Sequence, residues 1–333
     1  MARCPHLYLP REAIAKRGQV VTIRKIAPTA CQQSRLMRCH PSKTAALLAL
    51  ALCVGLGAVA LAQDPVEANR SSATPAVSQD RTVRVAGIVL KWIRGDKGAN
   101  FRRVEPMIRA AAAGGAKIVC TTECFLDGYA IADKSIPLET YRALGEPIPG
   151  GLFYRKLARL ADELDVHLVA GMLEADGETR YNTAVLIDPA GKLVGKYRKQ
   201  KLQHELVRNT PGKESSVFAT PYGPLGVMIC ADRTESSIVR GFCARGADFL
   251  ICPSGGMFGL EKNDPILRAR SRENGVYIVF VHPAEFLVTD PHGEIVTAEV
   301  VGDSLLIDAD QEARDPDKNV VLFFDLPLRV ASQ

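Results

Sequence analysis

The chain has 333 residues, of which 47% are hydrophobic and 24% charged, and its formal net charge is +5 at pH 7. This composition is typical of globular proteins and excludes a disordered chain. The length fits one large domain or two small ones, and either buries a sizeable core. Residues 1–62 hold nine Lys/Arg against one Glu, so the remainder carries a net charge of −3. A nucleic-acid-binding surface is therefore not expected on the folded part.

An uncharged apolar run, residues 44–62, follows Arg38 and Lys43 and ends in Ala-Leu-Ala. A positive flank, an apolar stretch and an A-x-A end are typical of a secretory signal peptide. We expect cleavage near Ala62 and an exported product, periplasmic or secreted. The alternative is an uncleaved segment that anchors the chain in a membrane, the only membrane contact that we expect.

The residues on either side of the apolar run complete the domain plan. The thirty-six residues before Met37 show no hydrophobic period, so the true start is Met1 or Met37. We assign residues 1–62 to an N-terminal extension with the signal peptide. Residues 63–81 are rich in Pro, Ser and Ala and are predicted to be a flexible linker. Residues 82–330 are predicted to form a single folded domain.

The hydrophobic pattern predicts alternating strands and helices in this domain. Strands are expected over residues 83–89, 116–122, 167–173, 180–187, 192–197, 217–219, 225–230, 248–252 and 277–281. Helices are expected over residues 100–113, 152–164, 235–244 and 265–274, the first of them stopped by Gly114-Gly115. Turns at residues 188–191 and 221–224 make two hairpins. The order indicates an α/β domain with mixed sheets covered by helices.

Three segments carry side chains suited to catalysis. Cys230 ends an apolar strand before a predicted helix, where backbone N–H groups favour a thiolate. Glu123 follows another apolar strand, where partial burial suits a general base. A basic run, residues 196–201, supplies a positive charge if one lysine turns inward. The spacing does not say which lysine does so, and alone each segment also fits a structural role.

Taken in order, these segments resemble the nitrilase or carbon–nitrogen hydrolase superfamily. The matching stretches are residues 122–129 (TECFLDGY), 195–201 (GKYRKQK) and 226–232 (GVMICAD). Further similarity runs to about Val296. The resemblance implies an α-β-β-α sandwich of nitrilase type with a Glu-Lys-Cys triad. The departures from the family pattern are Thr122 for proline, Lys201 for histidine, and Ser236 and Ser237 for Pro-Glu.

The resemblance also assigns roles to the matched residues. Cys230 is the nucleophile, Glu123 the general base and acid, and Lys199 the group that stabilises the oxyanion. Glu205 matches a second glutamate that orients the substrate or Lys199. The implied reaction is hydrolysis of a non-peptide C–N bond, in which an aliphatic amide gives a carboxylate and ammonia or an amine through a thioester.

The substrate is less defined by the sequence. Cys-x-Asp-Arg, with a second Arg after it, is similar to the N-carbamoyl amino acid hydrolases, whose arginines hold the substrate carboxylate. This chain keeps Arg233 but has Thr234 next, so half of the clamp is present. An amidase is the leading hypothesis and a carbamoylase the second. A catalytically inert binding protein of the same fold is the alternative from another class.

Other ligands find little support in the sequence. The histidines lack metal-ligand spacing, so we expect no metal and no cofactor. Five cysteines, an odd number, lie after residue 62, so at least one thiol stays unpaired within a single chain. The sequence does not decide whether Cys120 and Cys124 form a disulfide. The resemblance implies a homodimer.

Overall fold

The computed structural model describes residues 77–256, 260–301 and 320–329. The signal-peptide prediction, at residues 44–62, lies outside the described residues. No helix within the described ranges is long and apolar enough to span a membrane. The first strand begins at Val77, so the predicted linker of residues 63–81 is wrong at its C-terminal end, because residues 77–81 belong to a strand.

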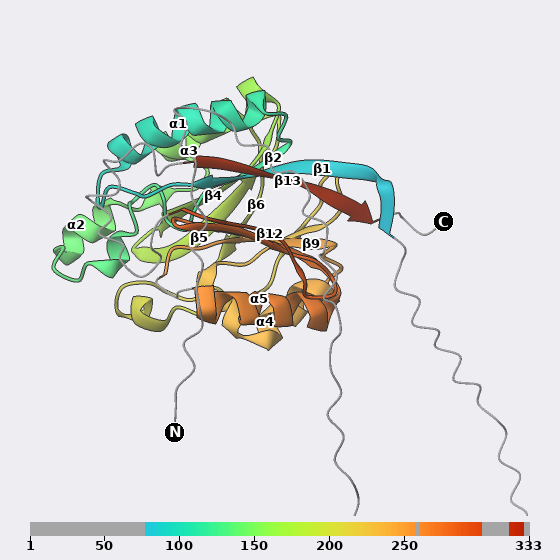
Figure 1. Cartoon of the computed structure of the whole chain (residues 1–333). Helices are drawn as coiled ribbons and strands as arrows, with labels where there is room; N and C mark the ends of the chain where they lie inside the picture. The colour runs from blue at the N-terminus through green and yellow to red at the C-terminus, as the bar shows by residue number, and fades with distance from the viewer. Residues whose placement is uncertain (1–76, 257–259, 302–319, 330–333) are drawn as a thin grey trace, which may run out of the picture. The chain divides into compact units, whose positions relative to one another are not determined.

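The first of two sheets has the order β13-β1-β2-β4-β5-β6 (Figure 1). Its strands are β1 (Val77–Val89), β2 (Ile118–Cys120), β4 (His167–Asp176), β5 (Thr179–Ile187), β6 (Leu193–Arg198) and β13 (Val320–Arg329), and the short β3 (Glu146–Pro147) pairs with β4. Strands β1, β2 and β4 are parallel, whereas β13, β5 and β6 join antiparallel. The β5–β6 hairpin is confirmed.

The second sheet has the order β12-β11-β10-β9-β8-β7. Its strands are β7 (Val217–Phe218), β8 (Leu225–Val227), β9 (Phe249–Pro253), β10 (Tyr277–His282), β11 (Glu285–Thr289) and β12 (Ile295–Val300). The second predicted hairpin, β7–β8, is confirmed. Strands β8, β9 and β10 run parallel, so their carboxyl ends meet at one edge of the sheet.

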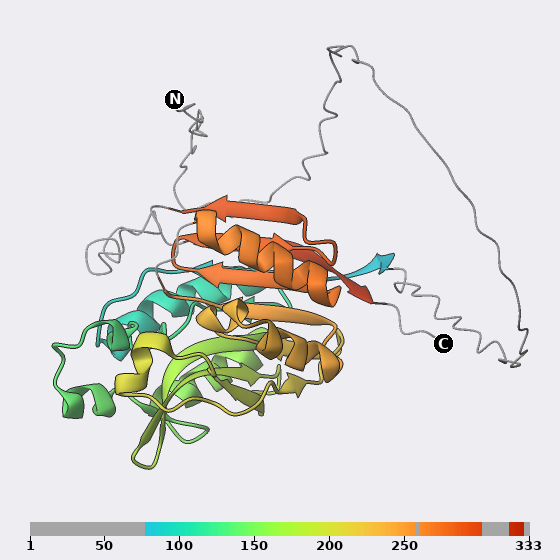
Figure 2. The same ribbon diagram turned by 90° about the horizontal axis from the view of Figure 1, so that it is seen from below.

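Helices cover the outer face of each sheet. Figure 1 shows α1 (Lys97–Ala113) and α3 (Leu152–Leu164) on the first sheet, and α4 (Ser236–Ala244) and α5 (Leu260–Asn274) on the second. Figure 2 shows α5, in orange, over strands of the second sheet. The connections add α2 (Leu138–Ala143) and three short 3-10 helices, η1 (Ala130–Ala132), η2 (Gln203–Val207) and η3 (Cys230–Thr234). The predicted α-β-β-α sandwich is confirmed.

Alternation along β1 builds two hydrophobic cores. Val85 and Val89 face the second sheet and pack in the core between the sheets. Ala86 and Ile88 face the other way, against α1 and α3. A strand that is buried on both faces has a nearly continuous run of apolar residues. The hydrophobic pattern therefore predicted this strand but not which of its residues face which core.

Several boundaries differ from the prediction. Helix α5 begins at Leu260 and not at residue 265, and Pro265 lies inside it. Strand β8 ends at Val227, three residues before Cys230. Helix α4 begins only at Ser236, so Cys230 starts the short helix η3 and does not stand at the head of α4.

Candidate active site

Glu123 leaves the first sheet directly after β2 and is 1% exposed. Its backbone N–H donates to the carbonyl oxygen of Ser254 at 3.2 Å, which ties it to the second sheet beyond β9. Gly171 on β4 makes room for this turn, since a Cβ there would lie 2.6 Å from the Thr122 carbonyl oxygen and 3.0 Å from the Cα of Glu123. The end of β2 therefore directs the carboxylate between the sheets.

Lys199 is the lysine of the basic run that turns inward. Along β6 the side chains alternate, so Tyr197 is buried between the sheets and Lys199, just beyond the strand, is 2% exposed. Lys196 and Arg198 lie on the opposite face, where both pair with Glu174. The alternation of side chains along β6 therefore identifies Lys199 as the inward lysine, which the spacing of the basic run did not do.

An ion-pair network joins three of the predicted residues. Lys199 Nζ donates to Glu123 Oε1 at 2.6 Å and also to Glu205 Oε1. The amide of Asn182 on β5 bridges the same two acids, donating to Glu123 Oε1 at 2.7 Å and to Glu205 Oε2 at 3.0 Å. Burial opposes the charge on Lys199, but the two carboxylates raise the pKa of its ammonium above the usual range. Lys199 therefore stays protonated.

Glu205 is fully buried in η2 and has a support of its own. The Asn209 amide donates to Glu205 Oε2 at 3.3 Å, and the Tyr141 hydroxyl donates to Asn209 Oδ1 at 2.6 Å. Asn182, Asn209 and Tyr141 were not predicted as site residues. Only Asn182 carried a signal, as a polar residue on the inward-facing register of an apolar strand.

Cys230 sits at a backbone position that bulky residues rarely adopt. Its φ is +46°, in the left-handed region, which costs about 1 kcal/mol or more in a residue other than glycine. Asp232, in the same turn, is fully buried and accepts hydrogen bonds from the backbone N–H groups of Ile229, Gln200 and Lys201 and from the Tyr197 hydroxyl. Asp232 thus fastens the turn of Cys230 to the segment that carries Lys199.

Two glycines after β9 bring the acid and the thiol into one site. A Cβ on Gly255 would lie 3.0 Å from Glu123 Oε2, and a Cβ on Gly256 would lie 3.2 Å from Cys230 Sγ. His282 holds Gly256 in place: its Nδ1 accepts from the Ala284 N–H at 3.1 Å, so its Nε2 is the N–H that donates to the Gly256 carbonyl at 2.9 Å. Glycine therefore leaves the space in front of the thiol open.

Arg233 lies beside the thiol and is 1% exposed. Its Nη1 approaches Cys230 Sγ to 3.6 Å, and its Nη2 donates to Asn263 Oδ1 at 2.5 Å. The guanidinium also lies over the ring of Phe280, 5.4 Å from the ring centre. Arg233 is therefore not an exposed residue, because Asn263 on α5 and Phe280 on β10 contact its guanidinium.

The four residues that depart from the family pattern lie in different surroundings. Thr122 is fully buried, and its hydroxyl has no hydrogen-bond partner among the described residues. Lys201 forms a half-exposed ion pair with Glu235, 2.6 Å long. Ser236 and Ser237 form the first turn of α4. None of the four enters the hydrogen-bond network of Glu123, Lys199 and Glu205.

Cys120 and Cys124 are both buried free thiols. Cys120 packs in the core between the sheets, whereas Cys124 packs with Trp92 and Tyr129. Burial raises the pKa of both thiols well above the usual range. The two side chains thus pack in different hydrophobic clusters.

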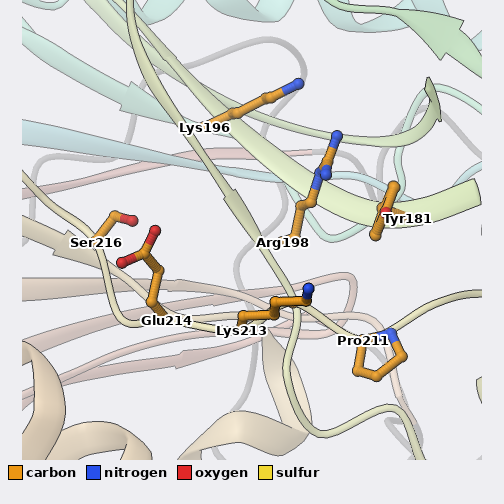
Figure 3. A pocket seen from close by; sticks show the side chains of 8 residues that line it. Tyr181, Lys196, Arg198, Pro211, Lys213, Glu214 and Ser216 are labelled. Atoms are coloured by element: carbon orange, nitrogen blue, oxygen red, sulfur yellow. The ribbon is translucent and has the colours of Figure 1, made fainter.

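A cavity opens beside Lys196 and Arg198, on the other side of the basic run (Figure 3). It is lined by Tyr181, Lys196, Arg198, Pro211, Gly212, Lys213, Glu214 and Ser216. The buried carboxylate of Glu174 already pairs with Lys196 and Arg198, and Asp176 pairs with Arg198 as well. Within the described ranges no group of three or more His, Cys, Asp or Glu side chains could hold a metal ion.

Comparison with known proteins gives the same family as the sequence motifs. A family model for carbon-nitrogen hydrolases matches residues 83–312. The omega-amidase NIT2 of Homo sapiens is 33% identical over 216 residues, which cover 60% of this chain and 74% of that protein. The mouse omega-amidase NIT2 is 30% identical over 251 residues, 68% of this chain and 87% of that protein.

Solved structures share the fold. Saccharomyces cerevisiae Nit3, a member of branch 10 of the nitrilase superfamily, is 26% identical with a TM-score of 0.62, over 74% of this chain and 90% of that chain. An amidase from Nesterenkonia sp. is 22% identical with a TM-score of 0.61, over 76% of this chain and 94% of that chain. Since the family model covers most of the chain, this protein belongs to the carbon–nitrogen hydrolase family, whose reaction is the hydrolysis of non-peptide C–N bonds of the amide type.

Proposed function

We propose that the protein hydrolyses a small aliphatic amide through a thioester on Cys230. The observation that carries this proposal is the buried contact of Lys199 with both Glu123 and Glu205, next to a thiol held at positive φ. The burial of three charged groups costs desolvation free energy. Its position beside a nucleophile supports a catalytic role over a purely structural one.

In the first step Glu123 takes the thiol proton. Its Oε1 accepts from Lys199 and Asn182, while Oε2 has no donor among the described residues and is the oxygen to receive that proton. Sγ of Cys230 then forms a bond to the amide carbon, and the carbonyl oxygen takes the electron pair. The ammonium of Lys199 and the backbone N–H of Ala231 stabilise this oxyanion.

In the second step the tetrahedral adduct collapses. The C–N bond breaks, Glu123 returns its proton to the departing nitrogen, and ammonia or an amine leaves. The acyl group remains on Sγ as a thioester. Glu123 then takes a proton from water, whose oxygen attacks the thioester carbon. The carboxylate product leaves, and the proton returns to the Cys230 thiol.

Glu205 acts in this scheme by positioning Lys199. With Glu123, Glu205 and Lys199 in contact, two negative charges and one positive charge lie together in a buried site.

A second candidate is the hydrolysis of an N-carbamoyl amino acid. The observation that favours it is the position of Arg233, whose Nη1 lies 3.6 Å from Cys230 Sγ. A guanidinium there suits a carboxylate a few bonds away from the reacting carbon, and an N-carbamoyl amino acid carries its carboxylate at that separation. The same argument favours amides of short dicarboxylic acids over neutral amides.

The test is to mix the protein briefly with a panel of amides and N-carbamoyl amino acids and to measure its intact mass and the ammonia released. We expect an acyl adduct that maps to Cys230, together with ammonia. Cys230→Ala should lose both while keeping its thermal unfolding midpoint, and Cys252→Ala, a buried thiol outside the network, should keep both. Turnover by Cys230→Ala would overturn the proposal. If no substrate reacts and iodoacetamide fails to label Cys230, the inert binding protein is the better account.

We also propose export through residues 44–62 and assembly as a homodimer. The apolar run behind a basic flank supports export, and the family resemblance supports the dimer. N-terminal sequencing of the natural protein should give Gln63 as the first residue, and an intact apolar run would instead indicate a membrane anchor. Light scattering after size-exclusion chromatography should give twice the mass of one chain, and a monomer would contradict the dimer.

A further inference from the structure

Strand β2 ends early beside β4 and leaves donors of β4 without a neighbouring strand. The parallel ladder ends at Cys120, and the Thr121 N–H makes one further backbone bond to β4, 3.0 Å long. The next N–H groups of β4 on this side belong to Gly171 and Leu173. If β2 continued, they would donate to the carbonyl oxygens of Thr121 and Glu123, because a parallel ladder advances by two residues at each bond.

Two side chains take the place of these carbonyl oxygens. The Gly171 N–H donates to Thr121 Oγ1 at 3.1 Å, and the Leu173 N–H donates to Asp127 Oδ1 at 2.9 Å. The other oxygen of Asp127 accepts from the Ala130 N–H at 3.1 Å. Asp127 is 1% exposed, and each of its oxygens has a donor. The donors of β4 are therefore paired although the chain has left the sheet.

This arrangement releases Glu123 from the sheet and fixes it elsewhere. Its backbone N–H donates to the Ser254 carbonyl beyond β9, and its carboxylate accepts from the Asn182 amide at 2.7 Å. Asn182 is the residue opposite Leu173 in the β4–β5 pair. The bond from Leu173 to Asp127 therefore closes a circle of contacts, which relates the backbone after Glu123 to the amide that holds its carboxylate.

We propose that Asp127 is a positioning residue of the thioester reaction: it holds the turn after Glu123 on β4 and so keeps the Glu123 carboxylate in reach of the Cys230 thiol. The proposal rests on the function proposed above, in which Glu123 moves the thiol proton. Among the described residues both oxygens of Asp127 accept from backbone N–H groups. Asp127 thus acts through the backbone of the turn and not on the substrate.

The first test separates kcat from KM in two variants of Asp127. Asp127→Asn keeps the size of the side chain and one acceptor oxygen, whereas Asp127→Ala removes both bonds. Ammonia release from the best amide of the panel gives kcat and KM. We expect kcat to fall about tenfold in Asp127→Asn and about 100-fold in Asp127→Ala, with KM within about twofold, because a misplacement of about 1 Å is costly in catalysis.

Glu146→Gln is the matched control. Glu146 lies on β3 beside the same strand β4 and is 2% exposed. Its Oε1 also accepts from two backbone N–H groups, those of Phe153 at 2.6 Å and Tyr154 at 3.1 Å. These bonds lead to α3 and not to Glu123. The variant should lower the thermal unfolding midpoint about as much as Asp127→Asn does, and it should keep kcat.

Thr121 provides a second pair of variants, which keeps the test decisive if the Asp127 variants fail to fold. Thr121→Val keeps the shape of the side chain and removes the acceptor of the Gly171 N–H, whereas Thr121→Ser keeps the hydroxyl. We expect Thr121→Val to lower kcat about fivefold or more and Thr121→Ser to stay within about twofold of the unmodified protein.

Alkylation of Cys230 by iodoacetamide measures the same positioning without an amide substrate. The thiolate is the form that reacts, so a displaced base should slow the labelling of Asp127→Asn at pH 7 by about fivefold or more. At pH 10, where hydroxide removes the thiol proton, the rates of the variant and the unmodified protein should converge. Glu146→Gln should match the unmodified protein at both pH values.

Three outcomes would overturn the inference: an unchanged kcat in Asp127→Asn, or in Thr121→Val where the Asp127 variants do not fold; an equal loss of kcat in Glu146→Gln; or slowed labelling that persists at pH 10. Failure of the proposed function gives a different result. If no amide is hydrolysed but the labelling of Cys230 at pH 7 depends on Asp127, the function is wrong and the positioning holds. If iodoacetamide labels Cys230 of the unmodified protein at neither pH, both are contradicted.

Discussion

Lys199 Nζ lies 2.6 Å from Oε1 of Glu123, in an ion pair whose side chains are 2% and 0% exposed. The desolvation of both charges offsets most of their attraction, so the pair itself adds little net stability. Loss of one partner is different, because it leaves the other charge buried and uncompensated. Lys199 is therefore required for both the fold and the chemistry.

We predict that Lys199→Met lowers kcat about 1000-fold or more, since the oxyanion loses its ammonium. The free energy of unfolding should fall by about 3–5 kcal/mol, because Glu123 and Glu205 are left facing each other. Ammonia release and urea unfolding measure the two effects. The double variant Lys199→Met with Glu205→Gln should regain stability but not activity, and regained activity would refute the role of the lysine.

Asp232 should be the structural link between the nucleophile and the lysine. Asp232→Ala leaves the donors of Ile229, Gln200, Lys201 and Tyr197 without their acceptor, and we predict a loss of about 3 kcal/mol or more in unfolding free energy. Asp325→Ala is the matched control. It removes an exposed ion pair with Arg84 and should cost less than about 1 kcal/mol. Equal losses in the two variants, measured in urea, would contradict this account.

His282 should make the fold sensitive to acid. Burial lowers the pKa of its imidazole to about 3, whereas the unfolded chain binds the proton near pH 6.5. Between these values the unfolded state holds more protons, so stability is complete above pH 6.5 and is lost as the pH falls. The decrease should be on the order of 4 kcal/mol by pH 3.5.

The change at His282 is checked by urea unfolding from pH 7 to pH 3.5. His282→Asn should flatten the pH dependence, although it lowers stability at pH 7 because the bond to Gly256 is altered. His292→Asn, at an exposed position, should keep the dependence of the unmodified protein. An unchanged slope in His282→Asn would place the acid sensitivity elsewhere.

Gly256→Ala should obstruct the thiol without unfolding the protein. The added methyl would lie 3.2 Å from Cys230 Sγ and 3.7 Å from the Tyr129 hydroxyl. We predict a decrease in kcat/KM of about tenfold or more and a similar decrease in the rate of Cys230 alkylation, because a misplacement of about 1 Å is costly in catalysis. In Gly150→Ala, a Cβ meets nothing within 4 Å, and both rates should stay unchanged.

Much of the fold could be predicted because its strands and helices are locally consistent. Helix α3 has the predicted bounds, and α1 ends where Gly114-Gly115 stops it. The strands β11, β12 and β13 were missed. Most residues of β12 are exposed, so apolar content is a weak signal there, and the pairing of β13 with β1 depends on a contact between distant parts of the chain.

The sequence predicted most of the residues that form the site but few of the contacts between them. Glu123, Lys199 and Glu205 lie together, as the ordered motifs indicated. The hydrogen bonds of Asn182 with Glu123 and of Asp232 with Gln200 join segments far apart in the chain, so no local spacing encodes them. The expected position of Cys230 at the N-terminus of the helix now labelled α4 was wrong, because Cys230 begins the short helix η3 and α4 begins only at Ser236.

The pairing of β1 with β13 has a consequence for biosynthesis. Strand β1 is the first of the described strands to leave the ribosome, yet β13, which covers its outer edge, is the last of them. Until then the edge of β1 offers unpaired backbone groups to any other strand. The sheet therefore closes only after Val320–Arg329 has been made, and a nascent chain that stops before Val320 keeps a surface that promotes aggregation.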